Sequence, residues 1–178
     1  MKLSDTNNQV ILVDEDDSQI GVMDKLEAHQ KGLLHRAYSV FIFNKKNELL
    51  IQQRTFDKYH SGGLWTNTCC SHPQPGEYLD ESVKKRLQEE MGITCDLSFA
   101  FRFIYRSQLD NGLFEHELDH VFIGQYSNGP IPNPVEVSDW KYKSFHSLTE
   151  EIQSNPEKFT SWFKICLPQM QEYLENKK

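Results

Sequence analysis

Residues 71–93 have the sequence SHPQPGEYLDESVKKRLQEEMGI, and this segment gives the strongest indication of the fold class. Val83, Leu87 and Met91 recur at four-residue steps, which is the spacing of apolar side chains along one face of a helix. The spacing predicts a helix over 80–91, and Gly92 stands where helices commonly end in a left-handed residue. Two prolines and a glycine make the preceding segment, 72–76, irregular. A loop, a helix and a second loop are therefore expected in that order.

The rest of the chain is mostly strand-like. Apolar runs and alternating patterns predict strands over 9–13, 38–43, 49–53, 99–108, 113–126 and 140–145. The segment 148–175 has a helical pattern that Pro156 and Pro168 are expected to interrupt. Mixed strands with few helices predict an α/β sandwich. Along 99–108, one face is expected to carry Phe99, Phe101, Phe103 and Tyr105.

Length and charge indicate how many domains the chain has and which kinds of partner it is expected to lack. The chain has 178 residues, which predicts one domain spanning 1–178. Its net charge is −7 and its basic residues are scattered, so no nucleic-acid partner is expected. The N-terminus lacks the apolar region of a signal peptide, and no apolar run reaches membrane length. We therefore expect a cytoplasmic monomer or weak dimer with no membrane partner, whose four cysteines are thiols.

Asp110-Asn111-Gly112 is a turn signal between two of the predicted strands. If these three residues form the loop, positions equally distant from Asn111 face one another. Tyr105 then lies opposite Glu117, and Ser107 lies opposite Glu115. A phenol beside a carboxylate can relay a proton. The other interpretation is that Tyr105 is one more aromatic residue of the core, and spacing alone favours neither.

Three histidines and two carboxylates form a candidate metal site. Glu115 and Glu117 are two apart and share a face of a strand, where two like charges require a cation or a proton. With His29, His35 and His72 they make three nitrogen and two oxygen donors, which suit Mn²⁺ or Mg²⁺, or less usually Zn²⁺. Each histidine taken alone is more often a surface or core residue.

His116-Glu117-Leu118-Asp119-His120 fits the HExxH pattern of zinc peptidases. That pattern binds zinc only on a helix, where residues four apart share a face. Here it follows a turn and continues into an apolar strand-like run. On a strand, His116 and His120 point away from Glu117, so we expect them to be ordinary sheet residues.

Cys70 lies in the segment WTNTCCSH, residues 65–72, which looks like a loop. It precedes the candidate ligand His72 by two residues, and a thiol beside a cationic site loses its proton more readily. The competing interpretation is a small buried apolar residue, which is what most free cysteines are.

The stretch from Ser71 to Ile93 resembles the Nudix box, a loop–helix–loop that gathers carboxylates around Mg²⁺ on a diphosphate. The spacing of Glu77, Glu89 and Glu90 before Gly-Ile matches that pattern. Two departures stand out: Ser71 replaces the leading glycine, and Lys85-Arg86 replaces Arg-Glu. Because the missing glutamate serves the metal site of Nudix hydrolases, the departure argues against diphosphate hydrolysis.

Taken together, the motifs resemble the type 1 isopentenyl-diphosphate isomerases, which have a Nudix fold. The matching residues span about 10–165: Lys25-x3-His29-x5-His35, Arg54-x3-Lys58, Trp65-Thr-Asn-Thr-Cys-Cys-Ser-His-Pro73, Glu90-Met-Gly92, Tyr105-Arg106, Glu115-His-Glu117 and Trp162. The resemblance implies a single α/β/α sandwich domain with a mixed β-sheet, a core of about 30–165, and extra N- and C-terminal elements. Cys69 is a departure, since a small apolar residue is expected beside the reactive cysteine.

The resemblance also implies roles for individual residues. Divalent-metal ligands would be His29, His35, His72, Glu115 and Glu117, with Glu90 holding a second ion, the Mg²⁺ that accompanies the diphosphate. Diphosphate contacts would come from Lys25, Arg54, Lys58 and Arg86, with Ser71 nearby. Proton transfer would involve Cys70 and Glu117, assisted by Tyr105, with Trp162 as an aromatic wall beside the reacting carbons.

The implied activity is interconversion of isopentenyl and dimethylallyl diphosphate by protonation and deprotonation through a tertiary carbocation. The substrate would be a small allylic or homoallylic diphosphate. A Nudix-type diphosphate hydrolase is the main alternative, and it needs the box glutamate that Arg86 replaces. A catalytically silent metabolite-binding domain is a third reading, which would be expected to lack Cys70 or Glu117.

Overall fold

The computed structural model describes residues 8–58 and 60–177. The first seven residues, part of the N-terminus in which the sequence shows no signal-peptide pattern, lie outside the described residues. Among the helices of the described ranges, none is both long and apolar enough to cross a membrane. That residues 1–178 form a single domain stays a prediction.

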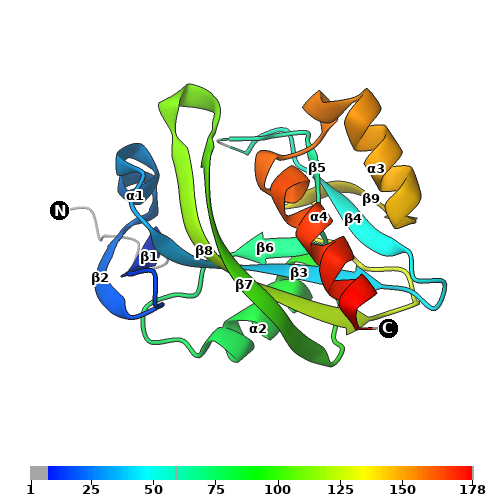
Figure 1. Ribbon diagram of the computed structural model, residues 1–178, viewed down its shortest axis with the longest axis horizontal. Coiled ribbons are helices and arrows are strands. Elements are labelled where there is room, and N and C mark those ends of the chain that lie inside the picture. Colours follow the sequence, from blue (N-terminus) through cyan, green and yellow to red (C-terminus); the bar gives the residue numbers. More distant parts are fainter. Residues whose placement is uncertain (1–7, 59, 178) are drawn as a thin grey trace.

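One mixed sheet carries the fold (Figure 1). Its strands in the described ranges are β1 Gln9–Val13, β2 Gln19–Asp24, β3 His35–Phe43, β4 Leu49–Arg54, β5 Trp65–Thr66, β6 Cys69–Ser71, β7 Leu97–Gln108, β8 Phe114–Gln125 and β9 Val137–Lys143. The helices are α1 Lys25–Lys31, α2 Leu79–Met91, α3 Phe145–Ser154 and α4 Ser161–Asn176, with short 3₁₀ turns at Asp110–Gly112 and Pro156–Lys158. β3 runs parallel to β8 and antiparallel to β1, β4 and β6, so it lies at the centre of the sheet.

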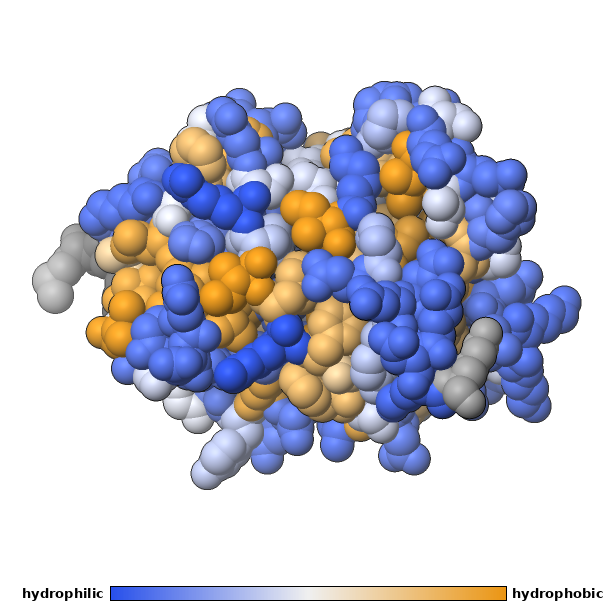
Figure 2. All heavy atoms as spheres, viewed as in Figure 1, coloured by the Kyte–Doolittle hydropathy of each residue, from blue (hydrophilic) through white to orange (hydrophobic). Residues whose placement is uncertain are grey.

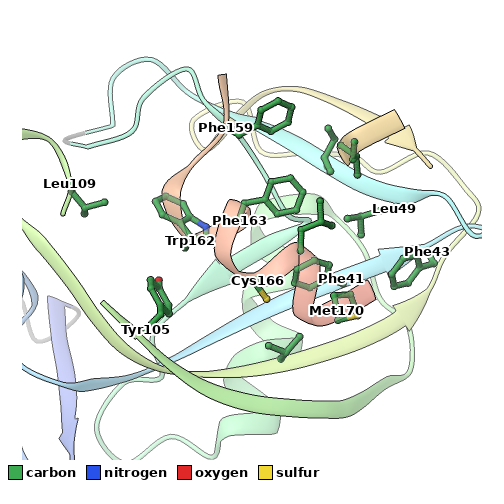
Figure 3. Packing of buried hydrophobic residues seen from close by; sticks show 14 of the residues in the cluster. Phe41, Phe43, Leu49, Tyr105, Leu109, Phe159, Trp162, Phe163, Cys166 and Met170 are labelled. Carbon is green, nitrogen blue, oxygen red and sulfur yellow. The ribbon is translucent and has the colours of Figure 1, made fainter. Parts of the chain in front are cut away.

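The two faces of the sheet are covered by different helices. Because successive side chains of a strand point to opposite faces, Val40 and Ile42 of β3 pack with Leu87 of α2 in one buried cluster. Phe41 packs with Phe163 of α4 in the other cluster (Figure 3). This burial on both sides explains the nearly continuous apolar run of β3. The expected α/β/α sandwich with a mixed sheet is confirmed.

The N-terminal elements extend the sheet at one edge. β1 pairs with β3 and with β2, and α1 follows β2 directly. Figure 2 shows apolar side chains gathered over β1 and β2, where Ile20 and Val22 are exposed. The edge is thus less covered than the centre of the sheet. Its contribution to the site is α1, which carries Lys25 and His29.

Helix α2 begins one residue before its predicted start and ends at Met91, as expected from the sequence. Gly92 has the left-handed φ of 64° and donates its N–H to Gln88 O. The last carbonyls of the helix accept hydrogen bonds from the next loop, Met91 O from Ile131 N–H at 3.0 Å and Glu90 O from Asn133 N–H at 2.9 Å. The helix end and this loop are therefore held together.

The β7–β8 hairpin has the register that the sequence predicts. Tyr105 pairs with Glu117, and Ser107 pairs with Glu115. The turn is made by Asp110–Gly112, where Asn111 adopts a left-handed φ of 60°. Because the segment from His116 to His120 lies in β8, the helical geometry that an HExxH zinc site needs is absent from it.

Three local expectations are wrong. A β-bulge between Phe99 and Phe101 turns Phe99 to the other face, where it packs on Phe122 with ring centroids 5.8 Å apart. Pro168 does not end α4, because apolar side chains on both sides of it are buried against the sheet and outweigh the lost hydrogen bond. Cys70 lies in strand β6 and not in a loop, since residues 69–71 pair with β3.

Gly92→Ala tests the contact between α2 and the following loop. A Cβ atom at this position would lie 2.4 Å from Ile131 O, and left-handed backbone adds a cost of about 1–2 kcal/mol for a non-glycine residue. We expect a loss of more than about 2 kcal/mol in the free energy of unfolding, measured by urea denaturation. Gly76→Ala is the matched control, because its φ is also positive but its Cβ would meet nothing within 4 Å. Equal losses in both variants would contradict the importance of the Ile131 contact.

Candidate active site and metal centre

Three pairings among four strands bring the predicted site residues together. His35 begins β3 and lies beside Glu117 in the parallel β3–β8 pair. Cys70 lies beside Ser39 in the antiparallel β3–β6 pair, which leads directly to His72. The hairpin register adds Tyr105 next to Glu117. Residues far apart in the chain are thus fixed side by side by backbone hydrogen bonds.

Three histidines and one carboxylate converge at the start of β3. One ligand atom from each of His29, His35, His72 and Glu117 lies within 4.8 Å of all the others. His72 Nε2 is 2.9 Å from Glu117 Oε1, and His35 Nε2 is 3.6 Å from the same oxygen. This group is compatible with a divalent metal ion, as the donor types of the sequence suggest.

The protonation of these histidines fits metal binding. Burial lowers the pKa of His29 to about 2 and that of His72 to about 4, so both rings are neutral at physiological pH. His35 Nδ1 lies 2.8 Å from Leu33 O, so its other nitrogen, Nε2, is the one that faces the group. A neutral imidazole is the form that coordinates a metal.

Glu115 and Glu117 are buried side by side and differ in charge. Burial alone would raise the pKa of Glu117, but hydrogen bonds from His35 and His72 bring it well below the usual range. Burial and the charge of Glu117 raise the pKa of Glu115 well above its usual range. Glu115 is not in the four-residue group, so its role as a ligand stays a prediction.

Tyr105 combines the two roles that spacing left open. Its ring is buried in the α4 side of the core and stacks on Phe103 with centroids 5.6 Å apart. Its hydroxyl donates to Glu117 Oε2 at 2.7 Å and is 3.1 Å from Glu115 Oε2. Burial raises the pKa of Tyr105, so the phenol keeps its proton. The hydroxyl therefore links the two carboxylates.

The neighbouring cysteines point to opposite faces of the sheet. Cys69 is fully buried in the cluster under α2, whereas Cys70 packs against the α4 side and lines the pocket. Burial raises the pKa of Cys70, and the Arg54 guanidinium only partly opposes this effect, so readier loss of the proton beside a bound cation stays a prediction. The choice of Cys70 over Cys69 as the accessible thiol nevertheless has a structural reason.

One pocket of about 150 Å³ joins these groups to basic side chains. Its walls include twelve of the predicted site residues: Lys25, Arg54, Lys58, Cys70, Ser71, His72, Arg86, Glu90, Tyr105, Glu115, Glu117 and Trp162. His29 and His35 are fully buried and do not line it. All four predicted diphosphate contacts therefore face the same space as the thiol and the carboxylates.

Arg86, the departure from the Nudix box, is held by two carboxylates. Its Nη2 lies 2.7 Å from Glu90 Oε2 and 2.8 Å from Glu136 Oε2, and Lys58 also donates to Glu136. Glu90 Oε1 accepts from Gln52 Nε2 at 2.6 Å. The box helix thus presents a cation to the pocket where a hydrolase would present a carboxylate.

Four residues that line the pocket were not singled out from the sequence: Tyr38, Ser39, His60 and Glu136. Ser39 and Tyr38 belong to a run that looks like pure core, and Ser39 donates to Asp119 Oδ2 at 2.8 Å. Glu136 and His60 lie in irregular segments with no recognisable spacing. Their approach to the pocket depends on contacts between loops, which periodicity does not reveal.

The outer histidines of the HExxH match serve the sheet. His116 Nδ1 lies 3.0 Å from Gly32 O, and His120 Nε2 lies 2.9 Å from Asp17 Oδ2. Neither belongs to the four-residue group. The expectation that they are ordinary sheet residues is confirmed.

Comparisons of the sequence with known proteins identify similar chains. The family model of the NUDIX domain matches residues 33–163. "Isopentenyl-diphosphate Delta-isomerase" of Pectobacterium atrosepticum is 52% identical, with 93% of this chain and 92% of that protein covered. "Isopentenyl-diphosphate Delta-isomerase 2" of Aromatoleum aromaticum is 49% identical, with 90% and 85% covered.

Solved structures add a comparison of the fold alone. DR0079 from Deinococcus radiodurans has a TM-score of 0.69 at 17% identity, covering 82% of this chain and 89% of that one. The MutT protein from Methanosarcina mazei has a TM-score of 0.66 at 21% identity, covering 82% and 96%. The sandwich fold is therefore shared with these proteins.

His35→Ala is expected to abolish binding of a divalent ion at the four-residue group. Removing a ligand should lower affinity for Mn²⁺ by more than the roughly 10–100-fold that loss of an outer-shell partner costs. Calorimetric titration with Mn²⁺, with the metal content of the purified protein, measures the effect. His116→Ala is the control on the neighbouring strand, and we expect its affinity to be unchanged. Loss of the ion in His116→Ala and retention in His35→Ala would refute the assignment.

Proposed function

The chain belongs to the Nudix family and, within it, to the isopentenyl-diphosphate Delta-isomerases, and on that premise we propose that Cys70 and Glu117 exchange protons with opposite faces of the substrate. Its activity is the interconversion of isopentenyl and dimethylallyl diphosphate. The observation that carries the residue assignment is that both side chains line one pocket with four basic side chains and Trp162.

The first step adds a proton to the double bond. An alkene is a weak base, so it needs an acid in a site from which water is excluded. The Tyr105 hydroxyl donates to Glu117, and this pair is the proposed source of the proton. His35 and His72 stabilise the negative charge of Glu117, which is the charge that remains after Glu117 gives up a proton.

Addition of this proton forms a tertiary carbocation, and the second step removes a proton from it. The Trp162 ring is buried at the end of the core cluster nearest to Tyr105 and Leu109 (Figure 3). An aromatic face stabilises a cation by about 1–2 kcal/mol when water is excluded. Cys70 then accepts the second proton, which requires its thiolate. Because burial raises the pKa of Cys70, Arg54 has the further role of favouring that thiolate.

The diphosphate is proposed to lie on Lys25, Arg54, Lys58 and Arg86, with Ser71 nearby. Guanidinium and ammonium groups bind phosphate oxygens through charge-assisted hydrogen bonds. Arg86 and Lys58 now share Glu136, so the anionic substrate would compete with this carboxylate for the same donors. A cation in place of the box glutamate thus favours binding of the substrate over its hydrolysis.

Two ions complete the proposal. His29, His35, His72, Glu117 and Glu115 would hold one divalent ion, Mn²⁺, Mg²⁺ or Zn²⁺, and Glu90 would hold a Mg²⁺ that enters with the diphosphate. The first ion, when bound, supplies positive charge that makes the proton shared by Glu117 and Tyr105 more acidic.

The acidic net charge supports a small-molecule substrate with no nucleic-acid or membrane partner. We further propose a cytoplasmic monomer or weak dimer.

Turnover of isopentenyl diphosphate with Mg²⁺ in D₂O tests the reaction itself. We expect dimethylallyl diphosphate that carries deuterium, because the added proton comes from groups that exchange with solvent. Proton and carbon NMR of the product measure both the isomer and the label. Release of inorganic phosphate without isomer would instead support the hydrolase alternative, and binding without either product would support a silent domain.

Cys70→Ala and Glu117→Gln test the two proton-transfer residues. Each is expected to lower kcat by more than about 10²–10⁴-fold, the usual contribution of one acid–base group. Cys69→Ala is the matched control, because its side chain faces α2 and lies outside the pocket. We expect it to keep most of the activity. Steady-state rates with circular dichroism of each variant separate loss of chemistry from loss of fold, and full activity in Cys70→Ala would overturn the assignment.

A further inference from the structure

His60 lies between the histidine–glutamate group and the aromatic wall of the pocket. Its ring is perpendicular to that of His29, at 89° and a centroid distance of 6.1 Å. It meets the Trp162 ring edge-on, at 78° and 5.9 Å. The side chain is buried and lines the same pocket as Cys70. His60 therefore borders the space in which the hydrocarbon part of the substrate is proposed to lie.

His60 is not part of the candidate metal group. The four ligand atoms that lie within 4.8 Å of one another come from other residues. Its position against Trp162 makes the ring part of the pocket wall.

The backbone around His60 is held firmly. The Arg54 guanidinium donates to His60 O at 3.3 Å and to Ser61 O at 3.2 Å, while its carbon lies 5.2 Å from the centre of the Trp162 ring. Ser61 has a left-handed φ of 52°, which is uncommon for a residue with a side chain. Asp110, in the β7–β8 turn, accepts from Ser61 N–H at 3.5 Å. These contacts fix where the imidazole lies relative to Trp162.

We propose that His60 closes the hydrocarbon end of the pocket and so limits the substrate to a five-carbon skeleton. This proposal rests on the proposed function and deepens it, by assigning the choice of substrate size to a named side chain. The pocket volume of about 150 Å³ is well below the roughly 300–1,000 Å³ of sites for drug-sized ligands. Removal of one ring from its wall therefore changes the free space substantially.

The experiment compares isopentenyl diphosphate with its homologue 3-ethylbut-3-enyl diphosphate, which carries one more methylene on the reacting carbon. The ratio of kcat/KM for the two substrates is measured for the wild type and for His60→Phe, His60→Val and His60→Ala. One methylene in an apolar pocket is worth roughly 10–200-fold in this ratio. We expect His60→Ala to lower the preference for the smaller substrate at least about 10-fold, His60→Val to lie between, and His60→Phe to keep it.

The graded series and two controls make the result decisive. His146→Ala, at an exposed position of α3, is expected to leave the ratio unchanged. The metal content of each His60 variant is measured alongside, and we expect it to equal that of the wild type. An unchanged ratio in both His60→Ala and His60→Val, or loss of the metal ion, would overturn the role in substrate size. Failure of the wild type to isomerise isopentenyl diphosphate would instead overturn the proposed function, and this proposal with it.

Discussion

The parallel pairing of β3 with β8 is the constraint on which the site depends. It sets His35 beside Glu117, and every further ligand is placed relative to these two residues. A slip of one residue would turn Glu117 to the α2 face and separate it from Tyr105. The hydrogen-bonded register resists this slip, because β3 is buried on both faces and each face packs against its own helix. The relative positions of His35 and Glu117 are therefore held by the same core that holds β3.

Burial of several charges in one place explains the remaining features. Glu115 and Glu117 are both removed from water, and two adjacent buried anions are unfavourable unless a proton, a metal ion or hydrogen-bond donors compensate them. The Tyr105 hydroxyl donates to Glu117 and lies 3.1 Å from Glu115, and His72 contacts Glu117. On the other side of the pocket, Glu136 compensates Arg86 and Lys58. The pocket therefore has an acidic half around Glu115 and Glu117 and a basic half around Arg86 and Lys58.

The acidic and basic halves of the pocket are also carried by partly different elements of the fold. The proposed proton-transfer groups lie on strands, and the three histidines lie on α1, on β3 and directly after β6, next to positions that backbone pairing fixes. The proposed diphosphate donors come from α1, β4, the segment that follows β4, and α2. A rigid set of reacting groups next to a more adaptable set of charged side chains suits an enzyme that must hold a small anionic substrate in one orientation. The resemblance to Nudix hydrolases lies in the scaffold, while Arg86 on the box helix has the proposed role of binding the diphosphate.

Much of this arrangement is determined by the sequence alone. The four-residue repeat before Gly92 predicted α2, and the Asp110–Gly112 turn predicted that Tyr105 faces Glu117, because both patterns depend only on local geometry. The same local reasoning placed Phe99 on the wrong face and ended α4 at Pro168, since a bulge and the burial of a helix are set by distant neighbours. Only the tertiary structure brought His60 and Glu136 to the pocket, and only it separated Cys69 from Cys70 by face. It also showed that burial opposes the thiolate of Cys70, because solvent exclusion is a property of the packed fold and has no signal in the order of residues.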